Sequence, residues 1–265
     1  MSSFAWINVS VSSHYRHPSY ESEITSQGIL GERVEILKSQ RLFSQIRQAD
    51  GYESWISTDQ LADDRVVQEG WDVMVCSHFI RIYDTPDTRS TCIRDGVVGC
   101  LLRAVEEQGE WLRLFLPDGT AGWAEKKHFG TAREISSASI VDTAREFLGY
   151  QYSWGGRSPK GFDCSGFVQT VFLLHGIILP RDSYQQQQQS VLSTDFNDAR
   201  PADLIFFGKT PERVTHVAIS LGNNRFIHAS GWIRINSLNK DDENFSEHHK
   251  QTFISVNRYH GASAK

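Results

Sequence analysis

Residues 149–176 read GYQYSWGGRSPKGFDCSGFVQTVFLLHG, a glycine-rich loop followed by a largely apolar run. The apolar residues of the run recur at helical spacing, and Gly176 stands where such a helix would end. Cys164 is therefore predicted at or near a helix N-terminus. The unpaired N–H groups and the positive dipole end favour a thiolate there, and can lower a cysteine pKa from about 8.5 to roughly 3.5–7.5. A small buried thiol without chemistry is the alternative.

Two later segments predict a β-hairpin that carries two histidines. Residues 214–221 and 225–229 alternate as strands do, and residues 222–224 separate them. A three-residue turn places His216 and His228 on one face of the hairpin. A two-residue turn places them on opposite faces unless a bulge intervenes. The pairing of the two histidines is thus conditional on the length of the turn.

These residue types fit nucleophilic catalysis by cysteine. That chemistry needs a thiolate, a base within hydrogen-bond reach and a third group that fixes the base. In such a set His216 pairs with the Cys164 thiolate and protonates the leaving amine, while His228 fixes the tautomer of His216. General acid–base help of this kind is typically worth about 10²–10⁴ in rate.

The first half of the chain contains an internal repeat. Residues 14–63 match residues 82–131 without a gap at nine of 50 positions. The identical pairs are Tyr15/Tyr83, Pro18/Pro86, Ser22/Ser90, Gly28/Gly96, Gly31/Gly99, Gln40/Gln108, Asp50/Asp118, Gly51/Gly119 and Trp55/Trp123. Each copy shows short alternating strands and an Asp-Gly turn, which predicts two small β-barrels of about 60 residues.

The composition changes after the second copy. Residues 138–148 have the apolar spacing of an amphipathic helix, and Gly149 follows as its C-cap. We therefore expect a multidomain protein with barrels at residues 1–63 and 64–131 and an α+β domain at residues 132–265.

Charge and hydropathy exclude two classes of partner. The chain has 27 Lys and Arg against 32 Asp and Glu, a net charge of −5, whereas duplex nucleic-acid binders carry an excess of cations. No apolar run approaches 18 residues, so no membrane span is predicted. The 11% of aromatic residues is typical of a folded protein.

The N-terminal sequence and the cysteines bear on location. The opening MSSFAWINVSVSSHYRHP lacks the basic and apolar regions of a secretory signal, which favours the cytoplasm unless a signal has been removed. The four cysteines form no CxxC pair and no metal-finger spacing, so free thiols are expected.

The motifs around the cysteine and the histidines resemble those of a known family. They are Tyr152-x-Trp154-Gly155-Gly156, Asp163-Cys164-Ser165-Gly166-Phe167, His216-Val217 and His228-Ala229. Together they look like the NlpC-type, papain-like cysteine peptidases of bacteria. The resemblance implies an α+β papain-like domain, a triad of Cys164, His216 and His228, and Tyr152 near the oxyanion site, with no metal or other cofactor. It also implies hydrolysis of γ-D-glutamyl bonds to meso-diaminopimelate or lysine in peptidoglycan stem peptides.

One subgroup of that family carries two bacterial SH3-like domains ahead of the peptidase, as the repeat does here. That subgroup resembles the γ-D-glutamyl-L-diamino acid endopeptidases, which act on muropeptides with a free N-terminal L-Ala and release L-Ala-γ-D-Glu. The resemblance implies a small muropeptide as partner, a monomer and a role in cell-wall recycling.

The same resemblance implies a set of substrate-binding residues. Asp182 and Ser183 would bind the substrate amine, because a carboxylate selects a free ammonium over an acylated one. Glu23 and Tyr52 are candidates from the first barrel. The residues expected to line the cleft are Trp154, Asp163 and Ser165. Arg157 and Arg181 could meet substrate carboxylates or lie on the surface.

Three alternatives stay open. The chain could be a secreted hydrolase whose SH3-like repeats bind the intact wall, or a non-catalytic wall-binding protein. Cys164, His216 and His228 could instead hold zinc, with Asp163 nearby. Two further segments are predicted to be solvated: the glutamine run 185–189, as one helical turn, and residues 240–249, as an exposed loop whose His248-His249 pair can bind metal adventitiously.

Overall fold

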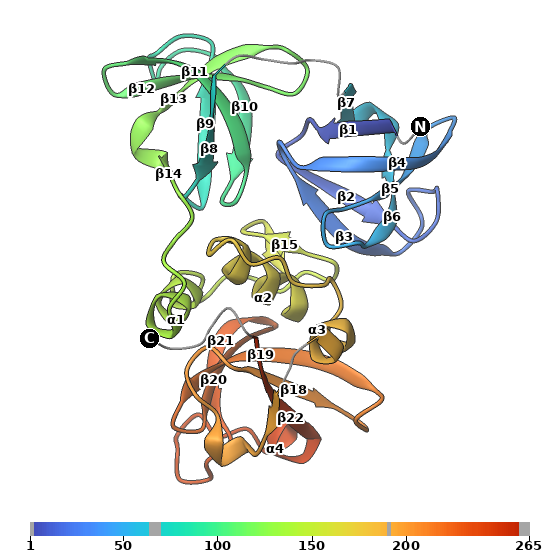
Figure 1. Cartoon of the computed structure of the whole chain (residues 1–265), viewed down its shortest axis with the longest axis vertical. Coiled ribbons are helices and arrows are strands. Elements are labelled where there is room, and N and C mark those ends of the chain that lie inside the picture. Colours follow the sequence, from blue (N-terminus) through green and yellow to red (C-terminus); the bar gives the residue numbers. More distant parts are fainter. Residues whose placement is uncertain (1–2, 64–69, 190–191, 260–265) are drawn as a thin grey trace. The chain divides into compact units, whose positions relative to one another are not determined.

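The computed structural model describes residues 3–63, 70–189 and 192–259 (Figure 1). The chain divides into two compact units, residues 1–132 and 133–265. The predicted limit between the two barrels, at residues 63 and 64, borders residues 64–69, which lie outside the described residues. In the described part of the chain, no helix is long and apolar enough to cross a membrane.

The first unit contains two antiparallel sheets of seven strands with the same topology. Their strand orders are β3-β2-β6-β5-β4-β1-β7 and β10-β9-β13-β12-β11-β8-β14, so each strand of the second sheet has its counterpart seven labels earlier. The strands of the first are β1 (Ser3–Ile7), β2 (Val11–Tyr15), β3 (Ile24–Ile29), β4 (Arg33–Gln40), β5 (Phe43–Arg47), β6 (Glu53–Ser57) and β7 (Leu61–Asp63). Those of the second are β8 (Trp71–Val75), β9 (Phe79–Tyr83), β10 (Cys92–Val97), β11 (Leu101–Gln108), β12 (Trp111–Phe115), β13 (Ala121–Glu125) and β14 (Phe129–Gly130). A 3₁₀ turn precedes the last strand of each, at Thr58–Gln60 and Lys126–His128.

The identities of the repeat occupy equivalent places in the two sheets. Tyr15 pairs with Trp55 across two strands of the first sheet, and Tyr83 pairs with Trp123 in the second. Gly51 and Gly119 both have φ +84°, the left-handed region that favours glycine. The repeat in sequence is therefore a repeat in structure.

The second unit is an α+β domain. Its sheet has six strands in the order β17-β22-β18-β19-β20-β21, and a two-stranded ribbon, β15-β16, lies in the loop before the cysteine. The strands are β15 (Arg157–Ser158), β16 (Gly161–Phe162), β17 (Leu192–Thr194), β18 (Leu204–Gly208), β19 (Val214–Gly222), β20 (Arg225–Ser230), β21 (Trp232–Ser237) and β22 (Phe253–Arg258). The helices are α1 (Ser137–Arg145), α2 (Cys164–Leu173), α3 (Ser183–Gln189), α4 (Glu247–Thr252) and a 3₁₀ turn at Phe196–Asp198.

Helix α2 is the centre of this domain. Its N-cap is Asp163, whose side chain accepts a hydrogen bond from the Gly166 N–H at 2.7 Å, so the helix starts where its first N–H groups find a partner. Every residue from 164 to 172 is buried, and the helix contacts β19 and β20 (Figure 1). The apolar run thus fixes the cysteine against the hairpin.

The hairpin of β19 and β20 has a two-residue turn and a bulge. Asn223 and Asn224 form the turn with φ of 50° and 64°, and Gly222 pairs with Arg225. The register then shifts, so that Ser220 lies opposite Phe226. This is the register that a three-residue turn would have produced. The bulge therefore keeps both histidines on one face despite the shorter turn.

Two predictions about solvated segments are correct only in part: residues 185–189 are helical and residues 240–246 lie outside helices and strands, but each segment also contains a buried side chain. Residues 247–252 form α4, with His249 buried at 7% exposure, because Ser246 caps the helix and Phe207 and Phe226 pack against the imidazole. In α3, Gln186 is fully buried and donates to the Pro180 carbonyl at 2.9 Å. All four cysteines are free thiols, as expected.

Candidate active site

Cys164 is the first residue of α2 and is only 8% exposed. Its sulfur accepts a hydrogen bond from the backbone N–H of Val217. Val217 follows His216 on β19, so the thiol lies beside the strand that carries the first histidine. Helix and hairpin thus bring together two residues that are 52 positions apart in the sequence.

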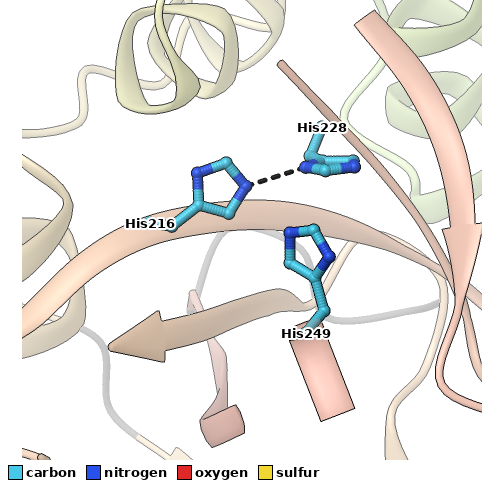
Figure 2. Close-up of side chains that lie close together, drawn as sticks. All are labelled: His216, His228 and His249. Carbon is cyan, nitrogen blue, oxygen red and sulfur yellow. Dashed lines mark hydrogen bonds between the residues drawn. The ribbon is translucent and has the colours of Figure 1, made fainter. Parts of the chain in front are cut away.

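Three side chains on adjacent strands form a hydrogen-bonded series. His216 Nε2 lies 2.8 Å from His228 Nδ1, and His228 Nε2 lies 2.9 Å from Asn236 Oδ1 (Figure 2 shows the two histidines). Asn236 Nδ2 donates to the Asn244 carbonyl at 3.0 Å, which fixes the orientation of the amide. The amide oxygen can therefore only accept from His228.

This series determines the tautomers of both neutral imidazoles. Because Asn236 Oδ1 accepts, His228 carries its proton on Nε2, and its Nδ1 must accept from His216 Nε2–H. The lone pair of His216 is then on Nδ1, the ring nitrogen that points away from His228 in Figure 2. His216 thus has the electron pair that a general base requires.

Burial keeps the imidazoles uncharged. It is the main cause that lowers the pKa of His216 well below its usual value, and the neighbouring histidines add to it. Burial likewise lowers the pKa of His228 to about 4, although the hydrogen bond that His228 donates to Asn236 Oδ1 acts in the opposite direction. Both rings are neutral at pH 7, so the tautomers deduced above are the relevant ones.

The predicted lowering of the Cys164 pKa is wrong. Burial raises the pKa of the Cys164 thiol to about 12, and the charge of Asp163 adds to this effect. The N–H groups of Val217 and Ser165 act in the opposite direction but do not outweigh desolvation. The resting pair is a thiol beside a neutral imidazole, so the proton must move as the sulfur attacks.

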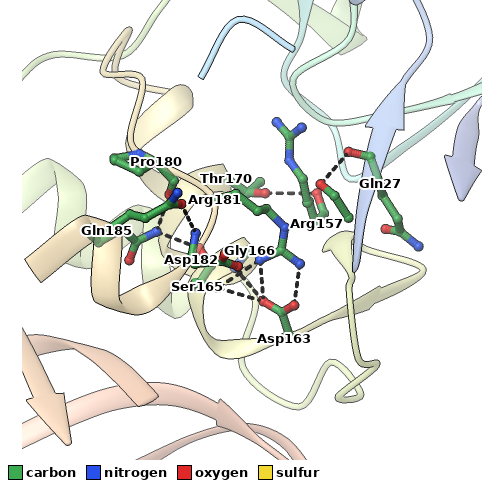
Figure 3. Close-up of polar contacts among 12 residues, drawn as sticks. Gln27, Arg157, Asp163, Ser165, Gly166, Thr170, Pro180, Arg181, Asp182 and Gln185 are labelled. Carbon is green, nitrogen blue, oxygen red and sulfur yellow. Dashed lines mark hydrogen bonds and ion pairs between the residues drawn. The ribbon is translucent and has the colours of Figure 1, made fainter. Parts of the chain in front are cut away.

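A buried ion pair lies directly behind the nucleophile. The Arg181 side chain is 2% exposed, and its guanidinium contacts the Asp163 carboxylate and donates to Ser165 Oγ at 2.8 Å (Figure 3). Arg181 is therefore not a surface residue. The contacts of Asp163 and Ser165 within this network are internal to the domain, and their contact with substrate stays a prediction.

Tyr152 and Trp154 lie in the loop before α2. Burial is the main cause that raises the pKa of Tyr152 to about 12, and the nearby groups Cys164 and Asp163 act in the same direction. The phenol therefore keeps its proton and can donate a hydrogen bond, as an oxyanion requires. Trp154 is 62% exposed, which leaves its indole accessible to a ligand.

The remaining predicted residues lie on two different units. Asp182 and Ser183 stand at the start of α3, where the Asp182 N–H donates to Gln185 Oε1 at 3.1 Å (Figure 3) and Ser183 is buried. Glu23 and Tyr52 lie in the first barrel, where Glu23 pairs with Arg16 at 2.8 Å. The participation of all four in substrate binding stays a prediction.

The sequence interpretation missed Asn236, and it placed His249 on an exposed loop rather than beside the other two histidines. On β21, Asn236 lies opposite Phe226 of β20, and Arg234 lies opposite His228 of β20. The Asn236 amide is therefore a diagonal neighbour of the His228 imidazole. That contact depends on a strand register that the sequence does not display. The helix of His249 had a signal, the N-cap serine at position 246, which accepts a hydrogen bond from the His249 N–H.

Comparison with known proteins agrees with this geometry. The model of the NlpC/P60 family matches residues 149–253. This part of the chain is an NlpC/P60 domain. A second model, of the bacterial dipeptidyl-peptidase SH3 domain, matches residues 14–61, the first barrel. The chain is accordingly an enzyme, a cysteine peptidase with SH3-like barrels ahead of its NlpC/P60 domain.

Two relatives share more than the NlpC/P60 domain. The γ-D-glutamyl-L-lysine dipeptidyl-peptidase of Bacillus cereus is 27% identical over 227 residues, which cover 78% of this chain and 68% of the relative. Dipeptidyl-peptidase 6 of Lysinibacillus sphaericus is 25% identical over 245 residues, 85% of this chain and 88% of the relative. A crystal structure of an NlpC/P60 family protein from Bacillus cereus has a TM-score of 0.85 at 22% identity and covers 97% of this chain and 99% of its own. That likeness concerns the fold.

Proposed function

We propose that the protein hydrolyses the γ-D-glutamyl bond to diaminopimelate or lysine in stem peptides with a free N-terminal L-Ala, and releases L-Ala-γ-D-Glu. The observation that carries the chemistry is the series from Asn236 through His228 to His216, which leaves a basic nitrogen on the strand beside Cys164. The names of the two relatives and of the matched SH3 model support the substrate class.

The proposed reaction has two steps. The Cys164 sulfur attacks the γ-carbonyl carbon while its proton passes to His216 Nδ1, and the Tyr152 phenol donates to the oxyanion. His216 then returns the proton to the departing amine of the diamino acid, which leaves a thioester. Water, deprotonated by His216, cleaves the thioester, and the thiol is restored. His228 and Asn236 keep His216 Nδ1 basic throughout.

The proposed selectivity depends on the substrate amine. The carboxylate of Asp182, with Ser183, Glu23 and Tyr52, would bind the ammonium of the N-terminal L-Ala. An acylated amine has neither the charge nor all the N–H donors, so these acceptors would lose their partner. Small peptides with a free amine are products of wall breakdown, and we include a recycling role and a cytoplasmic location in the proposal.

The test compares one peptide with its acylated form. L-Ala-γ-D-Glu-meso-diaminopimelate, the corresponding lysine peptide and their N-acetyl forms are incubated with the protein, and the products are followed by mass spectrometry. We expect L-Ala-γ-D-Glu from the free peptides only. Equal cleavage of free and acetylated peptides would contradict amine recognition, and cleavage of none of them would contradict the proposed function. Fractionation of cells that produce the protein tests the location.

Asn236 offers a test of the tautomer argument. Leucine at position 236 removes the acceptor that holds the His228 proton on Nε2, and we expect kcat to fall by about 10–100-fold, the usual cost of losing an outer-shell orienting group. Aspartate keeps an acceptor at that place, so Asn236→Asp should recover most of the loss. The two variants are compared by kcat, KM and circular dichroism. Equal losses in both would assign Asn236 a purely structural role.

A further inference from the structure

We propose that His216, His228 and His249 form a binding site for Zn²⁺, and that the bound ion switches the peptidase off. One ligand nitrogen from each ring lies within 4.8 Å of the other two. The rings come from β19, β20 and α4, and Figure 2 shows them turned toward a common point. Of the three, His228 and His249 are buried and His216 is partly exposed, so the ion has a side from which to enter.

The donor set suits zinc. Imidazole nitrogens are preferred zinc ligands, and three of them with one water complete a tetrahedral site. Metal-bound histidines almost always have their other ring nitrogen held by an oxygen. Here His228 Nε2 lies 2.9 Å from Asn236 Oδ1, and His249 Nδ1 lies 2.7 Å from Ser246 Oγ. The orienting oxygens of two ligands are therefore already in place.

The site needs only a small rearrangement. The hydrogen bond of 2.8 Å between His216 and His228 must open, since two zinc–nitrogen bonds of 2.0–2.1 Å at tetrahedral angles place the nitrogens about 3.3 Å apart. His249, on the short helix α4, must approach the other two. No ring has to lose the hydrogen bond to Asn236 or Ser246.

Inhibition follows from the tautomer of His216 and rests on the proposed function. Zinc takes the electron pair of His216 Nε2, so the single proton of the neutral ring moves to Nδ1. That nitrogen then has no lone pair with which to accept the proton of the Cys164 thiol. The ion therefore blocks the reaction without touching the sulfur or the substrate.

Metal binding is measured first, on the full chain and without substrate. Equilibrium dialysis against Zn²⁺ should give one ion per chain in the unmodified protein and in Cys164→Ala. His249→Leu and His249→Asn should each weaken binding by at least about tenfold. His248→Ala, a change of the neighbouring exposed histidine, is the matched control and should bind as the unmodified protein does. Circular dichroism checks that the variants are folded.

Cobalt identifies the ligands. Co²⁺ in the same site should show the visible absorption of a tetrahedral nitrogen environment and no sulfur-to-metal charge-transfer band. Such a band, or loss of binding in Cys164→Ala, would overturn the proposal in favour of a cysteine-containing site. Absence of stoichiometric zinc, or His249 variants that bind zinc as tightly as the unmodified protein does, would overturn it outright.

Activity is then compared with and without Zn²⁺ for each protein. We expect Zn²⁺ to lower the activity of the unmodified protein and of His248→Ala, and a chelator to restore it. The activity of the His249 variants should change far less when Zn²⁺ is added. Full activity of the zinc-loaded protein would overturn the inhibitory role. If the protein binds zinc but cleaves no muropeptide, the proposed function fails while the metal site stands.

Discussion

Replacing Cys164 by alanine is expected to lower kcat/KM on the free tripeptide by about 10⁴-fold or more, because the variant has no atom that can form the thioester. The other groups of the site can still orient the peptide, so binding should change less than turnover. Release of L-Ala-γ-D-Glu under saturating peptide measures turnover, and calorimetric titration of the same variant measures binding.

A second cysteine supplies the control for this variant. Cys100 is also a fully buried free thiol whose pKa burial raises to about 12, but it lies in the core of the second barrel. Cys100→Ala should keep its activity below the Tm of the variant. Turnover by Cys164→Ala comparable with that of the unmodified protein would remove Cys164 from the proposed mechanism.

The second large effect concerns stability. Replacing Arg181 by methionine leaves the Asp163 carboxylate buried without its cation, and breaking a buried pair in this way costs about 3–5 kcal/mol. We expect the free energy of unfolding of the second unit to fall by that amount. Hydrogen exchange of the α2 amides in increasing urea measures it, because those amides report on this unit alone.

An exposed pair provides the comparison. Arg145 lies 3.7 Å from Asp142 on α1, and both side chains are more than half exposed. Arg145→Met should therefore change the free energy of unfolding by about 0–1 kcal/mol. In the double variant Arg181→Met with Asp163→Asn, the free energy of unfolding should fall less than in Arg181→Met alone, because the unpaired buried charge is gone. Similar small changes in all three proteins would show that the buried pair contributes little.

Local pattern in the sequence predicted the parts of the site that depend on neighbours along the chain. Helix α2 begins at the predicted cysteine, and the expected helix at residues 138–148 is α1 followed by a turn that ends at Gly149. The two strands of the histidine hairpin were also predicted from their alternation. In each case the signal and the element it defines occupy the same short segment.

What the sequence could not supply depends on packing between distant segments. Desolvation decides the charge state of Cys164, and the burial of a helix residue depends on what packs around the helix rather than on the helix terminus itself. Asn236 reaches His228 only because β21 takes one particular register beside β20. His249 joins the other two rings because α4 packs against β18, a contact that the N-cap signal of its own segment does not reveal.

The turn at Asn223 and Asn224 and the bulge after Ser220 have a consequence for how this site can vary. Two residues of turn and one extra residue in the strand together set which side of the sheet His216 occupies. The distance between the two imidazole rings thus depends on the number of residues in the turn and the bulge. Many different side chains could occupy these positions without altering that distance. Loss or gain of a single residue there would turn His216 to the opposite face. The site therefore tolerates substitutions in the turn and the bulge of this hairpin, but not insertions or deletions.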